Sequence, residues 1–193
     1  MRWLFCLLLL ASFSIQAEEQ VTVCFNYGCR SQADVRFDDS QLLVLSKLLG
    51  SAQNAEQERE AISQAVGRML AWAGEQSPIW ADRGGNTADG GVSGAMDCID
   101  HSTTATRLLH LMADKGWLRY HRVLDVANRK RFLLFDHFAA QIGELDDATA
   151  NSPDDSRIVA RYVVDAWFFD NGHPAAVMPL ERWMAGESPD VSE

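Results

Sequence analysis

The order of two periodic patterns along the chain most constrains its fold. The first half carries apolar side chains three and four residues apart, a spacing typical of helices, in residues 39–50, 54–78 and 97–116. The second half carries runs rich in aromatic and β-branched residues, typical of strands, in residues 117–124, 131–142, 157–170 and 173–183. Helices that precede strands predict an α+β fold in which the helices pack on an antiparallel sheet.

Local signals place the ends of these elements. Ser40 is in position to cap the first helix, Asn54 the second and Asp97 the third, since each precedes an apolar helical pattern with a short polar side chain. Residues 127–130 and 170–172 contain Asn, Gly and charged residues, and we predict turns at both.

The first 17 residues are typical of a secretory leader. Arg2 precedes an apolar stretch from Trp3 to Phe13, and Ala17 offers a cleavage site before Glu18. The apolar run is short for a membrane span, although an uncleaved anchor is the alternative. We therefore expect a signal peptide at 1–17 and one exported domain at 18–193, in the periplasm or outside the cell, without stable membrane insertion.

The charge of the chain limits its partners. The formal net charge is −10, and removal of residues 1–17 would make it one unit more negative. An acidic surface disfavours binding to nucleic acid or anionic lipid. The basic run "NRKR" at 128–131 is predicted to be a solvated turn. We expect a protein or peptide substrate, no nucleic acid and no cofactor, while the oligomeric state stays open.

The cysteines divide into three kinds. Cys6 lies in the predicted leader. Cys24 and Cys29 are close in "CFNYGC", where Asn26 and a glycine can bend the chain, and a disulfide between them is expected in an oxidising compartment. Cys98 is then unpaired, so it is either a buried apolar residue or a functional thiol. Its acidic neighbours in "DCID" favour a functional thiol.

Two features near Cys98 bear on its chemistry. It lies in the first turn of the predicted helix 97–116, where unpaired amides and the helix dipole favour a thiolate. Asp97 and Asp100 oppose that charge, so a positive partner is required. The glycine-rich segment 82–95 that precedes the helix is either a flexible connector or a loop that approaches a substrate closely.

Histidine is the ordinary partner of a reactive thiol, and His137 is the best candidate. His137 lies in the apolar run 131–142 and Asp165 lies in the next one, so two polar residues on adjacent strands can relieve each other's burial. Such an acid orients the imidazole, which activates the thiol. We expect His101 to point away from the core and His110 to be exposed.

Cysteine in "DCID" (97–100), histidine in "FDHFAA" (135–140) and aspartate in "VVDAWF" (163–168) occur in an order that resembles the transglutaminase-like branch of papain-type cysteine enzymes. The bacterial transglutaminase-like cysteine proteinases resemble the chain especially, over about residues 80–183. The resemblance implies a papain/transglutaminase-like core and a triad of Cys98, His137 and Asp165. It also implies chemistry on amide bonds through a thioester, as peptidase or acyl transferase, without a metal. The chain departs from the family at one place. Family members often have an aromatic residue about two positions after the histidine, whereas here Phe138 and two alanines follow His137.

Two other interpretations stay open at this point. Asp97, Cys98, Asp100 and His101 form a dense group of potential metal ligands, so a metal-binding protein is one alternative. A binding module that keeps the fold without activity is the other. The backbone amide of Cys98 is a candidate oxyanion donor, because it lies at the helix N-terminus.

Overall fold

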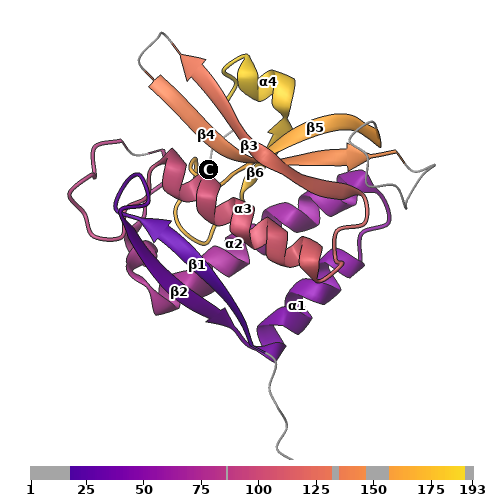
Figure 1. Cartoon of the computed structure of the whole chain (residues 1–193), viewed down its shortest axis with the longest axis horizontal. Helices are drawn as coiled ribbons and strands as arrows, with labels where there is room; N and C mark the ends of the chain where they lie inside the picture. Colours follow the sequence, from indigo (N-terminus) through magenta and orange to yellow (C-terminus); the bar gives the residue numbers. More distant parts are fainter. Residues whose placement is uncertain (1–17, 86, 132–134, 147–156, 190–193) are drawn as a thin grey trace, which may run out of the picture.

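A computed structural model describes residues 18–85, 87–131, 135–146 and 157–189 (Figure 1). The predicted leader at 1–17 lies outside the described residues. Within the described part the chain forms helices, one two-stranded antiparallel sheet and one four-stranded antiparallel sheet, which confirms the α+β class. No helix among these residues is long and apolar enough to cross a membrane.

The described part of the chain begins with a β-hairpin, which was not predicted from the sequence. Strand β1 (Glu19–Phe25) pairs antiparallel with β2 (Ser31–Phe37). The buried side chains follow the period of a half-buried strand at Val21, Val23 and Phe25 of β1 and at Val35 and Phe37 of β2, and Cys24 is buried as well. Cys24 and Cys29 form the expected disulfide at the tip of this hairpin.

The three predicted helices are confirmed. They are α1 (Asp39–Gly50), α2 (Ala55–Gln76) and α3 (Cys98–Asp114), and a 3₁₀ turn, η1 (Pro78–Ala81), follows α2. The expected caps at Asn54 and Asp97 are present. Ser40 does not cap α1, because Asp38 accepts the Gln41 amide instead and forms a full capping box.

The second half forms a sheet in the order β3-β4-β5-β6. Its strands are β3 (His121–Arg131), β4 (Phe135–Leu145), β5 (Ile158–Asp165) and β6 (Ala176–Pro179), and a short helix α4 (Leu180–Met184) follows. All neighbouring strands are antiparallel, as predicted.

Three boundaries in this half were wrong. Residues 127–130 continue β3 and are not a turn, because Arg129 pairs with His137 and is buried against Trp183. Tertiary packing thus overrides the local turn signal. The turn at 170–172 belongs to a longer connection, residues 166–175, between β5 and β6. Residues 180–183 are helical and not extended.

Helix α3 lies between the two sheets (Figure 1). One side of the helix packs on β1 and the other on β4. The face of α3 toward the core buries Ser102, Ala105, Leu108, Leu109 and Met112. A second, smaller core of Ala127, Ala139, Val163, Met178 and Trp183 lies between the sheet and α4.

Candidate active site

The N-terminus of α3 is held by the two acids that flank Cys98. The Asp97 side chain accepts the amides of Ile99 and Asp100, and the Asp100 side chain accepts the amide of Asp97, so both halves of a capping box are present. Cys98 is the first residue of the helix. No hydrogen bond found among the described residues uses its backbone amide, which leaves this donor at the helix end as an oxyanion candidate.

The thiol of Cys98 faces strand β4. Cys98 is a free cysteine and is half-buried. Its Sγ lies 3.7 Å from the backbone carbonyl oxygen of Asp136, the residue just before His137. The thiol is also among the groups that raise the pKa of the His137 ring. The first residue of α3 therefore lies beside the predicted histidine, which is 39 positions further along the sequence.

The imidazole of His137 is held by Asp165. Its Nε2 lies 2.8 Å from Oδ2 of Asp165, and the carboxylate is fully buried. Burial opposes a charge on the ring, but the hydrogen bond to Asp165 and the contact with Cys98 outweigh it and raise the pKa of His137 to about 9. The ring is therefore favoured as an imidazolium at neutral pH, and its Nδ1 is the nitrogen left for the sulfur.

The strand register explains why the two residues meet. Ala140 of β4 pairs with Val164 of β5, so a continued antiparallel register sets Asp165 opposite Ala139. His137 is two residues from Ala139 and shares its face of the sheet. His137 and Asp165 are thus diagonal neighbours on adjacent strands, which is the proximity that the sequence predicted.

Two further donors hold the Asp165 carboxylate. Nε1 of Trp183 donates to the same Oδ2 atom at 2.9 Å, and the backbone amide of Trp167 donates to Oδ1 at 3.2 Å. A buried carboxylate without such partners would cost several kcal/mol, about the order measured for unpaired buried charges. With His137, these donors occupy both carboxylate oxygens.

Aromatic rings surround the histidine. Trp167, Phe168 and Trp183 lie with their ring centroids 4.9, 5.8 and 5.5 Å from that of His137. Behind Trp183, the guanidinium of Arg129 lies 4.5 Å from the indole centroid. The side chain of His137 is only 15% exposed, so these rings leave little of the imidazole open to solvent.

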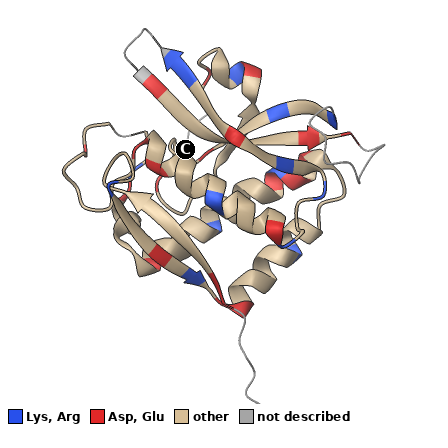
Figure 2. Cartoon of the chain, in the orientation of Figure 1, with Lys and Arg blue, Asp and Glu red and all other residues tan. Residues whose placement is uncertain are grey.

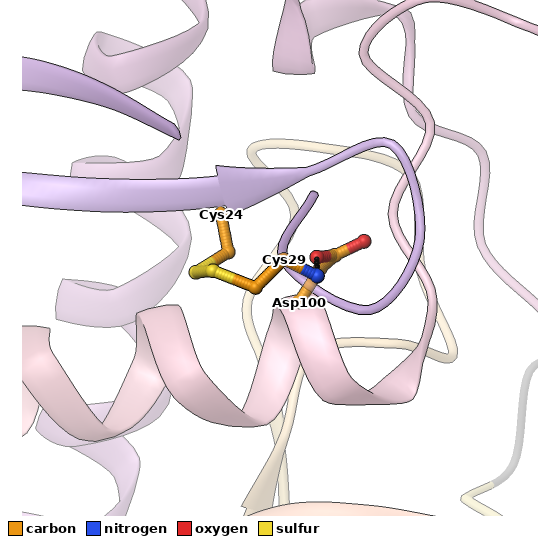
Figure 3. Close-up of side chains that lie close together, drawn as sticks. All are labelled: Cys24, Cys29 and Asp100. Carbon is orange, nitrogen blue, oxygen red and sulfur yellow. Dashed lines mark hydrogen bonds between the residues drawn. A yellow bond between two sulfur atoms is a disulfide. The ribbon is translucent and has the colours of Figure 1, made fainter. Parts of the chain in front are cut away.

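The disulfide loop lies directly over the first turn of α3 (Figure 3). The amides of Tyr27 and Cys29 donate to Asp100 at 2.8 and 2.6 Å, and the amide of Gly28 donates to Asp97 at 2.9 Å. Burial raises the pKa of Asp100 to about 6, whereas these amides act in the opposite direction. Figure 2 shows acidic residues at this end of α3 and in the loop beside it.

The metal alternative is not supported by the positions of its four residues. Asp97 and Asp100 are directed to backbone amides, Cys98 to β4 and His101 to Asp82, so they do not converge. Among the described residues, the one group of potential ligands that lie close together is Cys24, Cys29 and Asp100. Its two sulfurs are bonded to each other, so this group lacks the free thiolates that a metal requires.

The other histidines take structural positions. His101 does not point away from the core, as expected, but is buried with its Nε2 3.0 Å from Oδ2 of Asp82. That contact is close without the alignment of a hydrogen bond. It follows from α3 packing on the loop: Asp82 also accepts the Met96 amide at 2.7 Å. His110 is exposed, as predicted.

At two positions of the glycine-rich loop, close packing leaves no room for a side chain. A Cβ on Gly94 would lie 2.0 Å from the carbonyl oxygen of Pro78, and one on Gly84 would lie 2.4 Å from the backbone of Phe169. Gly94 also has a φ of +93° and donates its amide to Asn26. These contacts join the loop to the protein body, so it is not a free connector.

Sequence reasoning missed Trp183, Trp167 and the amides of the disulfide loop. Trp183 was assigned to a strand, although a buried indole needs an acceptor and the predicted buried acid Asp165 precedes it by 18 residues. The backbone amides of the disulfide loop could not be predicted as donors, because every residue type except proline supplies an amide.

No family model matches the chain, and the comparisons with curated proteins and with solved structures found no match.

Proposed function

We propose that this protein is an exported cysteine-dependent enzyme that acts on amide bonds, as a peptidase or an acyl transferase. The observation that carries the proposal is the placement of the Cys98 thiol against the backbone next to His137, together with the contact between His137 and the buried Asp165. Nucleophile, base and orienting acid are the three parts of a catalytic triad. Resemblance to the transglutaminase-like cysteine enzymes remains part of the proposal.

In the proposed reaction, Cys98 Sγ attacks the carbonyl carbon of an amide as a thiolate. The His137 imidazolium gives its proton to the leaving amine, and the C–N bond breaks to leave a thioester on Cys98. Water or a second amine then attacks the thioester while His137 takes a proton from it. The C–S bond breaks, and the acid or the new amide leaves the regenerated thiolate–imidazolium pair.

The remaining residues have supporting roles in this scheme. Asp165 holds the imidazole in place and stabilises its positive charge, and Trp183 and Trp167 hold the carboxylate. The Cys98 amide, at the start of α3, is placed to donate to the oxyanion of each tetrahedral intermediate. The disulfide favours an oxidising location, either the periplasm or outside the cell.

The test is the rate at which iodoacetamide labels Cys98 near neutral pH. His137→Ala is expected to slow labelling by about tenfold, because the imidazolium no longer favours the thiolate. His110→Ala is the matched control, since this exposed histidine lies on the same helix as Cys98. Equal labelling of the wild type and His137→Ala defeats the proposal.

An inactive binding module is the second candidate. The observation that favours it is the aromatic cover over His137, which leaves 15% of its side chain exposed. Hydroxylamine added during turnover of peptides distinguishes the two, because it captures a thioester as a hydroxamate. A Cys98→Ala variant that keeps full function in cells would favour the binding module.

A further inference from the structure

The structure points to a second role for the Cys24–Cys29 disulfide, which rests on the function proposed above. We propose that the disulfide loop is a positioning element for Cys98, and that its reduction uncouples Cys98 from His137. The enzyme would then be active in its oxidised form and inactive when a dithiol has opened the loop.

The loop has an unusual backbone that needs a constraint. Asn26, Tyr27, Gly28 and Cys29 all have φ between +55° and +68°, and three of them are not glycine. A left-handed conformation costs roughly 1–2 kcal/mol for each non-glycine residue. The disulfide closes this short ring, so the constraint is lost when the bond is broken.

That conformation aims consecutive amides at the acids on either side of Cys98. Tyr27 and Cys29 donate to Asp100, and Gly28 donates to Asp97 (Figure 3). Successive amides in such a conformation form a concave binding site for an anion. Here the anion is the capping box that begins α3, so the loop fixes the helix turn that carries the thiol.

The loop is also joined to the body on its other side. The amide of Asn26 donates to the carbonyl of Ala95 at 2.8 Å, and its side-chain oxygen accepts the amide of Gly94 at 2.9 Å. The Cys24 amide donates to Thr104 of α3 at 3.0 Å. The loop therefore connects the segment before Cys98 to the helix that follows it.

The disulfide has features that favour its reduction. Cys29 is partly exposed, whereas Cys24 is buried, so the attacking thiol reaches Cys29. An Nη atom of Arg107 lies 3.4 Å from the Cys24 sulfur, where it stabilises that sulfur as the leaving thiolate. Attack on Cys29 gives a mixed disulfide and releases Cys24. The second thiol of the reductant then closes its own disulfide and releases Cys29, so two electrons and two protons pass to the protein.

Reduction would place two separate sulfurs beside a buried acid. The Cys24, Cys29 and Asp100 ligand atoms lie within 4.8 Å of one another. Repulsion between a released thiolate and the carboxylate, together with the left-handed backbone, favours opening of the loop. Asp100 then loses two of its amide donors, and the first turn of α3 loses the contacts that hold Cys98 against His137.

The experiment compares the dependence of Cys98 labelling on His137 in two backgrounds. Iodoacetamide labelling at pH 7, followed by mass spectrometry of the Cys98 peptide, is measured with and without His137→Ala. In the intact protein, His137→Ala is expected to slow labelling by about tenfold. In Cys24→Ser/Cys29→Ser, the same substitution is expected to change the rate less than about twofold, since the contact is already lost.

The outcomes separate the two proposals. An equal effect of His137→Ala in both backgrounds overturns this inference and leaves the proposed function intact. No effect in the intact protein overturns the proposed function and this inference with it. Dithiothreitol, removed before labelling, should have the same result as the double serine variant, and Arg107→Gln should slow the reduction.

A second variant keeps the test valid if the double serine variant does not fold. Asp100→Asn leaves the disulfide in place but directs an amide group at the loop amides. Loss of the Asp100 charge near the sulfur would by itself speed labelling of Cys98. Slower labelling that no longer depends on His137 therefore shows that Cys98 has moved away from His137. Glu58→Gln is the matched control, because Glu58 is also buried and accepts two backbone amides, far from Cys98. Its labelling should keep the dependence on His137.

Discussion

The indole Nε1 of Trp183 donates to Oδ2 of Asp165 at 2.9 Å, the same oxygen that faces His137. Helix α4 thus takes part in the candidate site through Trp183. The indole ring is fully buried, and its plane is tilted by 35° from that of the imidazole. Trp183 therefore both holds the acid and packs against the base.

Trp183→Phe removes the donor and keeps most of the ring. Loss of one hydrogen bond to a charged group costs about 1.5–3 kcal/mol. Without this bond the Asp165 carboxylate is held less firmly in the orientation that faces His137. We expect Cys98 labelling at pH 7 to slow by several-fold while circular dichroism still shows the native fold. Stopped-flow or mass-spectrometric alkylation rates provide the measurement.

The control for this substitution is Trp80→Phe. Trp80 is 70% exposed, so the same chemical change there should leave the labelling rate within about twofold of the wild type, as expected for a surface site. Equal labelling rates in Trp183→Phe and Trp80→Phe would show that the indole donor does not support Asp165.

The pKa of His137 predicts how the stability depends on pH. Asp165 and Cys98 raise this pKa from 6.5 to about 9, against the effect of burial. A raised histidine pKa contributes stability that is fully present below pH 6.5 and is lost as pH rises through 9. We expect the free energy of unfolding of the wild type to fall over this window, relative to that of His137→Gln.

An NMR titration of the His137 ring measures the same effect directly. The midpoint should lie near pH 9 in the wild type. In Asp165→Asn it should fall, because the hydrogen bond that favours the charged ring is weakened while burial remains. Urea unfolding at several pH values provides the stability curve. A wild-type midpoint close to 6.5 would contradict the assigned contacts.

Helical periodicity was sufficient to predict α1, α2 and α3, because each is long, amphipathic and capped. The sheet was harder to predict. Arg129 lies in "NRKR", which has the composition of a solvated turn, yet it is buried because Trp183 and the end of α4 offer it acceptors. Trp183 is 54 residues away from Arg129 in the sequence, so a local sequence pattern cannot predict this contact.

The candidate triad was predictable for a physical reason. His137 and Asp165 each interrupt an apolar run, and polar residues buried on neighbouring strands need one another. Cys98 stood out because it is unpaired and starts a helix between two acids. His101 shows the limit of this reasoning. It was placed outside the core because its partner, Asp82, lies in a glycine-rich loop whose path no periodicity reveals. The backbone donors to Asp100 are equally hidden, since any residue type supplies an amide.

The buried contact between Asp82 and His101 predicts a stability effect. Asp82→Ala removes the partner of a buried imidazole and the acceptor of the Met96 amide, so the free energy of unfolding should fall by about 3 kcal/mol or more. In His101→Leu, Asp82 keeps the Met96 amide, and the loss should be smaller. Urea unfolding of the two single variants and the double variant gives the coupling energy.

The sign of that coupling decides the interpretation. If the two residues stabilise each other, the double variant is more stable than the sum of the single losses predicts. Strict additivity would show that the 3.0 Å contact contributes nothing, and that Asp82 acts through the Met96 amide alone.

Gly94 provides a prediction about the loop that leads into Cys98. Gly94→Ala would add a Cβ 2.0 Å from the Pro78 carbonyl oxygen, at a residue whose φ is +93°. Both the clash and the left-handed backbone act against the folded state, so we expect a loss of more than about 2 kcal/mol in the free energy of unfolding. Thermal and urea unfolding measure it.

Gly91→Ala is the matched control for this loop. Gly91 is exposed, and a Cβ there meets no atom within 4 Å, so the same substitution should change stability by less than about 0.5 kcal/mol. Because Gly94 donates its amide to Asn26 of the disulfide loop, Gly94→Ala should also weaken the dependence of Cys98 labelling on His137, whereas Gly91→Ala should not. Equal stability of the two variants would mean that the chain bends around Pro78 without the close approach described above.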